Sequence, residues 1–145
     1  GGEGLAVVDT ELGRIGLGIC YDIRFPELAA LYAARGVQIL VYPGAFNTTT
    51  GPLHWELLQR ARAVDNQLFV LTCSPARDEQ GGYVAWGHST AVDPFANVLG
   101  TRDETEGIVF ADLDLSEIET RRSNMPLRQQ RRRDLYGLLD LGVGG

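Results

Sequence analysis

The sequence predicts an α/β fold built on a mixed β-sheet, and two observations support this prediction. The first 72 residues alternate short apolar runs with longer amphipathic runs, in the order strand, helix, strand, helix, strand. After residue 72, further strand-like runs follow one another with turns and no long helix between them. The first pattern predicts right-handed parallel crossovers and the second predicts antiparallel additions to the same sheet.

The opening elements follow from local signals. The first strand is expected at residues 14–20, where the run RIGLGIC is short and apolar. A helix is expected at residues 26–35, because Pro26 suits the first helical position and Gly36 suits the position after the last. The second strand is expected at residues 37–42, where VQILVY is closed by a Pro-Gly pair.

A second helix is expected at residues 52–65. Apolar side chains recur there at helical spacing, which predicts that they form its buried face. The residues of this predicted stripe are Leu53, Leu57, Ala61 and Val64. A third strand is expected at residues 67–72, where the run is QLFVLT.

The remaining elements are shorter. Strands are expected at residues 85–92, around residues 98–99 and at residues 107–111, each bounded by turn residues. A short helix is expected at residues 116–122. The chain therefore reads as one domain, and 145 residues are enough for a domain with a core of its own.

Composition excludes several classes of protein. An apolar fraction of 44% argues against disorder, and a net charge of -6 argues against a nucleic-acid-binding protein. No run of about 18 apolar residues is present, so no membrane span is expected. The first residues lack the basic and then apolar order of a signal peptide, so a cytoplasmic location is expected, with the mitochondrion left open. Two cysteines do not make a disulfide scaffold.

The predicted sheet indicates where a site would lie. Ligands of open α/β sheets bind outside the carboxyl ends of the strands, and parallel neighbours have these ends at one edge. The first three predicted strands end near Cys20, Tyr42 and Thr72. The loops that follow are expected to form one pocket, and its candidate residues are Cys20, Arg24, Phe46 and Thr50.

Cys20 is the candidate nucleophile. A cysteine at a strand-to-turn junction before a helix has an accessible sulfur, and Gly16 and Gly18 would let other chain segments pack closely behind it. The alternative is a small buried side chain, which is the common role of a free cysteine. Cys73 lies in an apolar strand run and is expected to be structural.

The histidines leave two interpretations open. His54 opens the second predicted helix near the loop edge, so it is better placed than His88 to pair with Cys20. The alternative is a helix-start histidine that is bonded to the backbone. Two histidines and two cysteines without close spacing do not form a metal site, and no cofactor is expected.

The end of the chain is rich in arginine. This segment fits a surface that binds an acidic partner or nucleic acid, or a solvated surface with ion pairs. No interleaved aromatic residues support nucleic acid. The arginines concerned are Arg121, Arg122, Arg128, Arg131, Arg132 and Arg133.

Residues 13–27, GRIGLGICYDIRFPE, resemble the catalytic-cysteine segment of the nitrilase superfamily of carbon–nitrogen hydrolases. The resemblance continues through residues 41–67 and through the segments YVAWGHSTAVDP and PLRQQRRRDLY, so it covers almost the whole chain. Within the superfamily, GAFNTTTG and SPARD are most similar to the omega-amidases, which hydrolyse the terminal amide of 2-oxo acids.

This resemblance implies a fold and an activity. The implied fold is half of a four-layer α-β-β-α sandwich, in which residues 1–145 form the C-terminal part of one hydrolase domain whose N-terminal half is absent. The implied activity is hydrolysis of 2-oxoglutaramate or 2-oxosuccinamate through a thioester, with release of ammonia. Expected partners are this small 2-oxo-acid amide and either a second copy in a homodimer or the missing half, with neither nucleic acid nor membrane.

The resemblance also implies residue roles. The catalytic triad is Cys-Glu-Lys with Cys20 as nucleophile, and the backbone N–H of Tyr21 helps to stabilise the oxyanion. Three further residues match positions that hold the 2-oxo-acid end of the substrate, and these are Arg24, Phe46 and Thr50. A guanidinium suits this task because it can bind a carboxylate with two hydrogen bonds.

The chain departs from the family pattern at the other two catalytic groups. In the family the glutamate and the lysine precede the cysteine by far more than 19 residues. Glu3 and Glu11 do not match the glutamate motif, and all 13 basic residues are arginines, so there is no lysine. Two hypotheses follow. The chain is part of a working amidase whose other half lies elsewhere, or it is an inactive nitrilase-like module retained for binding or assembly.

Overall fold

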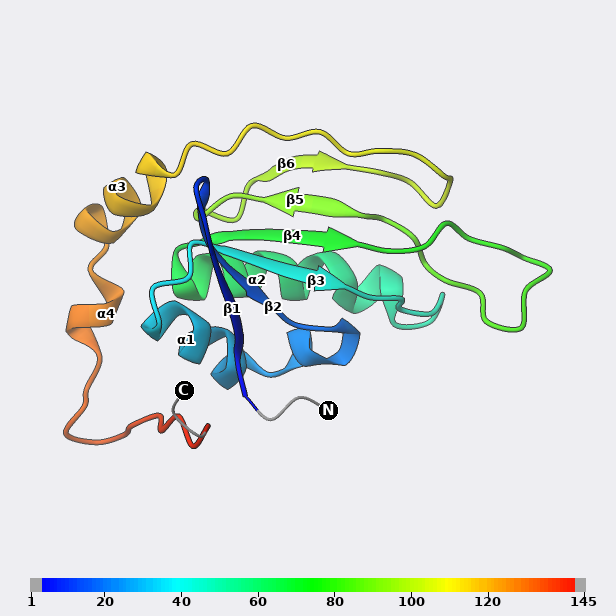
Figure 1. Cartoon of the computed structure of the whole chain (residues 1–145). Coiled ribbons are helices and arrows are strands. Elements are labelled where there is room, and N and C mark those ends of the chain that lie inside the picture. The colour runs from blue at the N-terminus through cyan, green and yellow to red at the C-terminus, as the bar shows by residue number, and fades with distance from the viewer. Residues whose placement is uncertain (1–3, 143–145) are drawn as a thin grey trace.

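The computed structural model describes residues 4–142, and six strands form one sheet in it (Figure 1). The sheet order follows the chain order, and the second, third and fourth strands are parallel while the other neighbours are antiparallel. The predicted α/β class with a mixed sheet is therefore confirmed. The strands are β1 (Ala6–Thr10), β2 (Gly13–Leu17), β3 (Ile39–Pro43), β4 (Phe69–Cys73), β5 (Thr90–Val92) and β6 (Val98–Thr101).

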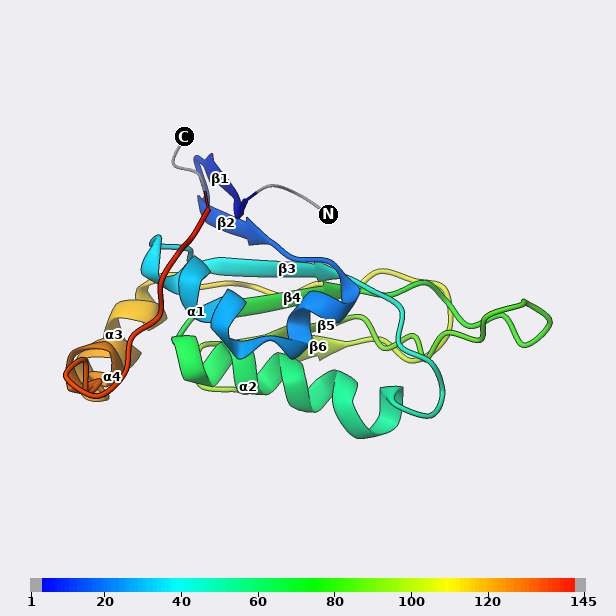
Figure 2. The same cartoon turned by 90° about the horizontal axis from the view of Figure 1, so that it is seen from below.

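Two helices cover one face of this sheet (Figure 2). They are α1 (Pro26–Ala34) and α2 (Glu56–Asn66). A 3₁₀ turn, η1 (Cys20–Arg24), leads from β2 into α1, and a wide helical turn, η2 (Gly51–Trp55), leads into α2. After the sheet, α3 (Ser116–Asn124) and α4 (Leu127–Gln130) lie at one end of the molecule.

The helix predicted at residues 26–35 is confirmed, with Pro26 in its first turn and Gly36 at φ +81° just beyond its end. The hairpin partner β1 was not predicted from the sequence. The Thr10 hydroxyl donates a hydrogen bond to the Gly13 carbonyl, and Gly13 has φ +138°. These two residues close the turn between β1 and β2. A turn from Thr10 to Gly13 after an apolar run is therefore the sequence signal that could have predicted the hairpin.

The buried stripe predicted for the second helix is wrong at Leu53 and Leu57, while Ala61 and Val64 are half-buried. Leu53 and Leu57 are 66% and 62% exposed. The buried side chains of α2 are mostly polar, and they are Gln59, Arg62, Ala63 and Asn66. Several of these polar groups find partners there, since the Thr72 hydroxyl donates to Gln59 Oε1 at 2.9 Å and Arg62 Nε donates to the Ile23 carbonyl at 2.9 Å. Within the described residues, Gln59 Nε2 and Asn66 Oδ1 are buried without a partner. Apolar spacing cannot detect such partners.

Two of the later strand predictions also need correction. Residues 107–111 form no strand, although they run extended beside β6 (yellow in Figure 1). Ile108 and Phe110 are 74% and 83% exposed, so the alternating pattern is present but has no ladder partner among residues 4–142. Of residues 85–92, only Thr90–Val92 joins the sheet, while Ala85 forms an isolated bridge with Asn47.

The two faces of the sheet are covered unequally. On the helical face, Leu40, Tyr42 and Val70 are fully buried against α1 and α2. On the other face, Ile39 and Phe69 are covered by Ile118 and its neighbours. Farther along that face, Leu17 and Val8 remain 41% and 45% exposed. One face is thus sealed, and the other is a partly open apolar surface.

No helix within residues 4–142 combines the length and the apolar character that crossing a membrane requires.

Candidate functional site

Cys20 has an unusual backbone conformation. It follows β2 by three residues, begins η1 and has φ +46°, a region that side chains other than glycine seldom adopt. Such strain is of order 1–3 kcal/mol and tends to occur at functional sites. The half-buried Sγ atom lies 3.8 Å from the Ala45 carbonyl oxygen, next to the loop that follows β3.

Glycines make the close packing around Cys20 feasible. A Cβ atom at Gly44 would lie 2.8 Å from Cys20 Cα, which real Cβ atoms do not tolerate. A Cβ at Gly18 would lie 2.4 Å from the ring of Tyr42. A Cβ at Gly16 would likewise lie 2.7 Å from the ring of Tyr32, so the expected close packing at Gly16 and Gly18 is confirmed. Burial raises the pKa of the Tyr42 phenol well above its usual range, so this packing surface stays uncharged.

The turn that carries Cys20 is held by its own residues. The Asp22 carboxylate accepts a hydrogen bond from the Ile19 N–H at 2.8 Å, and the Asp22 N–H donates to the Ile19 carbonyl at 2.9 Å. Tyr21 is 64% exposed, and its ring lies 5.9 Å from that of Phe25. The next residue after Cys20 therefore faces the outside of the fold.

Arg24 and Phe46 lie together, as the sequence predicts. The Arg24 guanidinium carbon lies 4.4 Å from the centroid of the buried Phe46 ring and 5.1 Å from that of Tyr21. Within the described part of the chain, Arg24 Nε has no hydrogen-bond partner. The aromatic contacts orient the guanidinium, and in that part of the chain its Nε atom is buried without an acceptor.

His54 contacts Arg24. Arg24 Nη1 lies 3.3 Å from His54 Nδ1, close enough for the arginine to donate a hydrogen bond to this ring nitrogen. No hydrogen bond joins His54 to Cys20 in the region the structure describes. Of the two interpretations, pairing with Cys20 is not supported. The His54 N–H does donate to the Thr50 carbonyl at 2.8 Å.

Thr50 lies in the same loop but makes a different contact. Its hydroxyl donates to Asn47 Oδ1 at 3.0 Å, and the same oxygen accepts the Thr50 N–H at 2.8 Å. Asn47 thus folds the loop between β3 and α2 into a compact turn. Across residues 4–142, the Thr50 hydroxyl forms no hydrogen bond with Arg24 or Cys20.

A second loop, residues 83–88, supports the loop that carries Phe46, and the sequence did not predict this. The Trp86 N–H donates to the Phe46 carbonyl at 2.7 Å, and the Tyr83 hydroxyl donates to the Ala45 carbonyl at 2.8 Å. A Cβ at Gly51 would lie 2.2 Å from the Trp86 side chain. The two loops therefore pack without space between them. The only signal for this contact in the sequence was the pair of aromatic residues, Tyr83 and Trp86, that follows the segment SPARD (residues 74–78).

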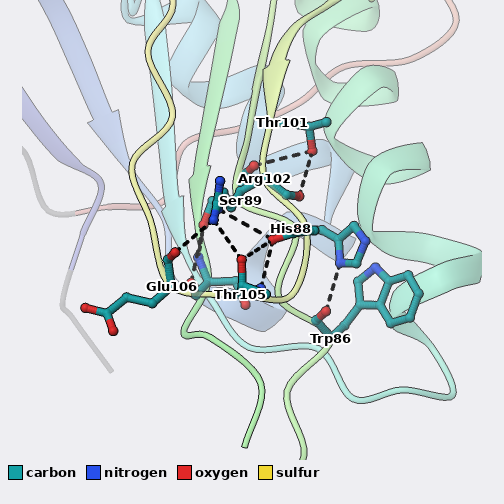
Figure 3. Close-up of polar contacts among 9 residues, drawn as sticks. Trp86, His88, Ser89, Thr101, Arg102, Thr105 and Glu106 are labelled. Atoms are coloured by element: carbon teal, nitrogen blue, oxygen red, sulfur yellow. Dashed lines mark hydrogen bonds and ion pairs between the residues drawn. The ribbon is translucent and has the colours of Figure 1, made fainter.

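Figure 3 shows how this supporting loop is anchored in turn. The His88 and Trp86 rings stack with centroids 4.2 Å apart, and His88 Nδ1 lies 2.8 Å from the Trp86 carbonyl oxygen. The Arg102 N–H donates to the Ser89 carbonyl at 2.8 Å, and its guanidinium donates to the Thr105 hydroxyl at 2.7 Å. These contacts connect the loop after β4 to the turn after β6.

Arg62 is a further residue that the sequence did not predict. Its side chain is buried beneath η1, where Nε donates to the Ile23 carbonyl at 2.9 Å and Nη2 donates to the Arg24 carbonyl at 3.1 Å. Its Nη1 lies 3.8 Å from the Asp65 carboxylate. One buried guanidinium thus satisfies the last carbonyls of the turn that bears Cys20 and Arg24.

The sequence of this chain is similar to the sequences of known proteins. Residues 1–123 match the family described as Carbon-nitrogen hydrolase. The chloroplastic omega-amidase of Arabidopsis thaliana is 65% identical over 140 residues, which are 97% of this chain and 38% of that protein.

Solved structures agree with the sequence comparison. Saccharomyces cerevisiae Nit3, a member of branch 10 of the nitrilase superfamily, matches with a TM-score of 0.86 and 53% identity, over 90% of this chain and 48% of that one. A mutant of the amidase from Nesterenkonia sp. AN1 matches with a TM-score of 0.73 and 30% identity, over 93% of this chain and 47% of that one. Its active-site cysteine carries the acetamide moiety of fluoroacetamide. The chain spans about half the length, or less, of these proteins.

Arg62 gives a testable prediction. Arg62→Met leaves two buried carbonyls without donors, so we expect a loss of about 2–4 kcal/mol in the free energy of unfolding. We also expect faster alkylation of Cys20 by iodoacetamide, because η1 loosens. Urea unfolding measures the first effect, and labelling in a Cys73→Ser background measures the second. The matched control is Arg60→Met on the same helix, where the side chain is half exposed and the expected loss is below about 1 kcal/mol. Equal effects of the two variants would contradict the role of Arg62.

Proposed function

This chain belongs to the carbon–nitrogen hydrolase family, and from that premise we propose that it supplies the nucleophile and the carboxylate-binding side chain of an omega-amidase. One observation carries the proposal. A strained cysteine at the exit of β2 lies beside the loop whose Phe46 supports the Arg24 guanidinium. A nucleophile and an anion-binding group on one sheet edge suit a substrate with an amide at one end and a carboxylate at the other.

The proposed chemistry has two steps. The Cys20 thiolate attacks the amide carbon, a C–S bond forms, and the C–N bond breaks as the nitrogen takes a proton and leaves as ammonia. Water then attacks the thioester, the C–S bond breaks, and the products are a carboxylate and the free thiol. In both steps negative charge develops on the former carbonyl oxygen, and the Tyr21 backbone N–H is our candidate donor to it.

Arg24 is the proposed specificity residue. Its contact with the Phe46 ring orients the guanidinium, which we propose binds the carboxylate of a 2-oxo acid. Substrates of this chemistry are 2-oxoglutaramate and 2-oxosuccinamate. Thr50 would contribute its hydroxyl only after exchanging its present contact with Asn47 for the substrate.

The chain does not hold every group that this chemistry needs. It has no lysine, and among the described residues no glutamate forms a hydrogen bond with Cys20. We therefore propose that the catalytic glutamate and lysine implied by the family resemblance come from polypeptide outside these 145 residues. The coverage of about half of each relative supports this proposal.

A second candidate function is an inactive nitrilase-like module that binds or assembles. The observation that favours it is the absence of lysine, together with the partly open apolar sheet face around Val8 and Leu17. The two candidates differ in one measurable respect. Only the amidase loses turnover when Cys20 is replaced in the complete assembly.

Ammonia release from 2-oxoglutaramate tests the proposal. The 145-residue chain alone should show negligible turnover, because a missing oxyanion donor lowers turnover about 10²–10³-fold and a missing general base about 10²–10⁴-fold more. The assembly that contains the glutamate and the lysine should be active. In that assembly Cys20→Ser should abolish turnover, while Cys73→Ser, the matched control, should leave it unchanged. Turnover that survives Cys20→Ser would sink the amidase proposal.

Arg24→Lys in the same assembly tests the carboxylate site. The positive charge stays but the planar, two-pronged contact is lost, so catalytic efficiency with a 2-oxo-acid amide should fall about ten- to a hundred-fold. Efficiency with a neutral amide of similar size should change far less. Equal losses for both substrates would mean that Arg24 supports the fold through Phe46 and His54 instead.

We also propose that a second copy packs on the exposed leucines of η2 and α2. Leu53 and Leu57 lie one helical turn apart and are both mostly exposed, so together they form a small apolar surface on one side of the helix. Light scattering at micromolar concentration should therefore detect association. The double variant Leu53→Asp with Leu57→Asp should reduce it, whereas Leu12→Asp, at an 82% exposed position in the first hairpin, should not. A stable, soluble monomer of the unmodified chain would disprove this interface.

A further inference from the structure

The arginine-rich end of the chain forms a hollow that the proposed amidase chemistry does not use. It lies between α3, α4 and the end of α2, at the opposite end of the parallel strands from the Cys20 loops (Figure 1). Its volume is about 780 Å³. The charged side chains that line it are Glu119, Arg122, Arg128 and Arg133. Three positive charges against one negative charge make this a basic site on a chain whose net charge is -6.

Arg122 is the central group of this hollow. Its side chain is only 18% exposed, and within residues 4–142 its Nε and Nη2 atoms are buried with no hydrogen-bond acceptor. Its Nη1 lies 3.5 Å from Glu119 Oε1, but the Glu119 side chain is 78% exposed. An exposed carboxylate at this distance compensates a buried cation poorly. Arg122 therefore lacks an adequate counter-charge.

The other basic groups increase this imbalance. Burial and the positive charge of Arg128 lower the pKa of the Arg122 guanidinium from its ordinary value. Like charges gathered in one hollow repel each other unless an anion lies between them. The last carbonyls of α3 do not supply that negative charge freely, because Gln67 Nε2 donates to the Arg121 and Met125 carbonyls at 3.2 and 2.7 Å.

We propose that this hollow binds a phosphate group, with Arg122, Arg128 and Arg133 as donors. Guanidinium groups match phosphate oxygens with paired hydrogen bonds, and a dianion compensates the two excess positive charges. The Glu119 carboxylate, whose Oε1 lies 3.5 Å from Arg122 Nη1, competes with the phosphate for this arginine. The volume of the hollow admits either free inorganic phosphate or the phosphate of a small ester. The sequence left open whether these arginines bind an acidic partner or nucleic acid or form a solvated surface with ion pairs. This proposal assigns them a small anionic ligand.

Isothermal titration of the 145-residue chain at constant ionic strength, with chloride as the background anion, tests this proposal. One arm uses inorganic phosphate and the other uses glycerol 3-phosphate. Arg122→Gln should weaken the Kd for phosphate about ten- to a hundred-fold, which is the usual effect of losing a charged hydrogen bond. Glu119→Gln should tighten it, because the competing carboxylate is gone. Tighter binding of the ester than of inorganic phosphate identifies an ester as the ligand, and equal binding identifies free phosphate.

The chain offers a matched control pair. Arg60 and Glu56 also lie 3.5 Å apart on a helix surface, and neither lines the hollow. Arg60→Gln and Glu56→Gln change the net charge by the same amounts as the test variants and should leave the Kd unchanged. Arg128→Gln, at another partly buried position of the hollow, repeats the test if Arg122→Gln does not fold. Equal weakening by Arg60→Gln and Arg122→Gln would overturn the proposal, as would the absence of binding in both arms, which would leave the hollow to an acidic protein segment.

Discussion

The backbone of Gly44 lies so close to Cys20 that a side-chain carbon at position 44 would be 2.8 Å from the Cys20 Cα. This contact joins the exits of β2 and β3, and the Gly44 N–H continues the connection to the Cys73 carbonyl of β4 at 2.9 Å. Three parallel strands therefore end in one tightly packed edge. The positive φ of Cys20 is tolerated because the surrounding segments hold the backbone in place, and the same packing directs the sulfur toward Ala45.

Buried polar side chains of α2 hold this edge of the sheet in place. Arg62 hydrogen-bonds the carbonyls that end η1, and Gln59 bonds Thr72 of β4. These contacts explain why α2 turns a polar face toward the core and leaves Leu53 and Leu57 outside. A buried arginine requires partners with defined geometry, so it restrains the turn more specifically than an apolar contact would. The same orientation exposes the two leucines on which we propose that a second copy packs.

The two faces of the sheet are covered unequally, so one of them also presents apolar side chains to the outside. The helical face is sealed by α1 and α2, whereas the opposite face leaves Val8 and Leu17 partly exposed. A chain that spans about half of its relatives, has a partly open apolar face and contains no lysine fits the proposal that further polypeptide completes the site. The basic hollow around Arg122 lies at the other end of the parallel strands from Cys20.

Local signals in the sequence determined the α/β class, the limits of α1 and the sheet edge that carries the candidate site. Pro26 and Gly36 mark helix ends through their own backbone preferences, and the residues after parallel strands meet at one edge for topological reasons. The rule and the family resemblance grouped Arg24 with Phe46 at one sheet edge, and the structure adds that the guanidinium lies over the Phe46 ring. Only the tertiary structure decided which face of α2 is buried, that His54 contacts Arg24, and that Arg62 and Trp86 hold the site. In each of these cases the outcome depends on hydrogen-bond partners far away in the chain, and the spacing of apolar residues carries no information about them.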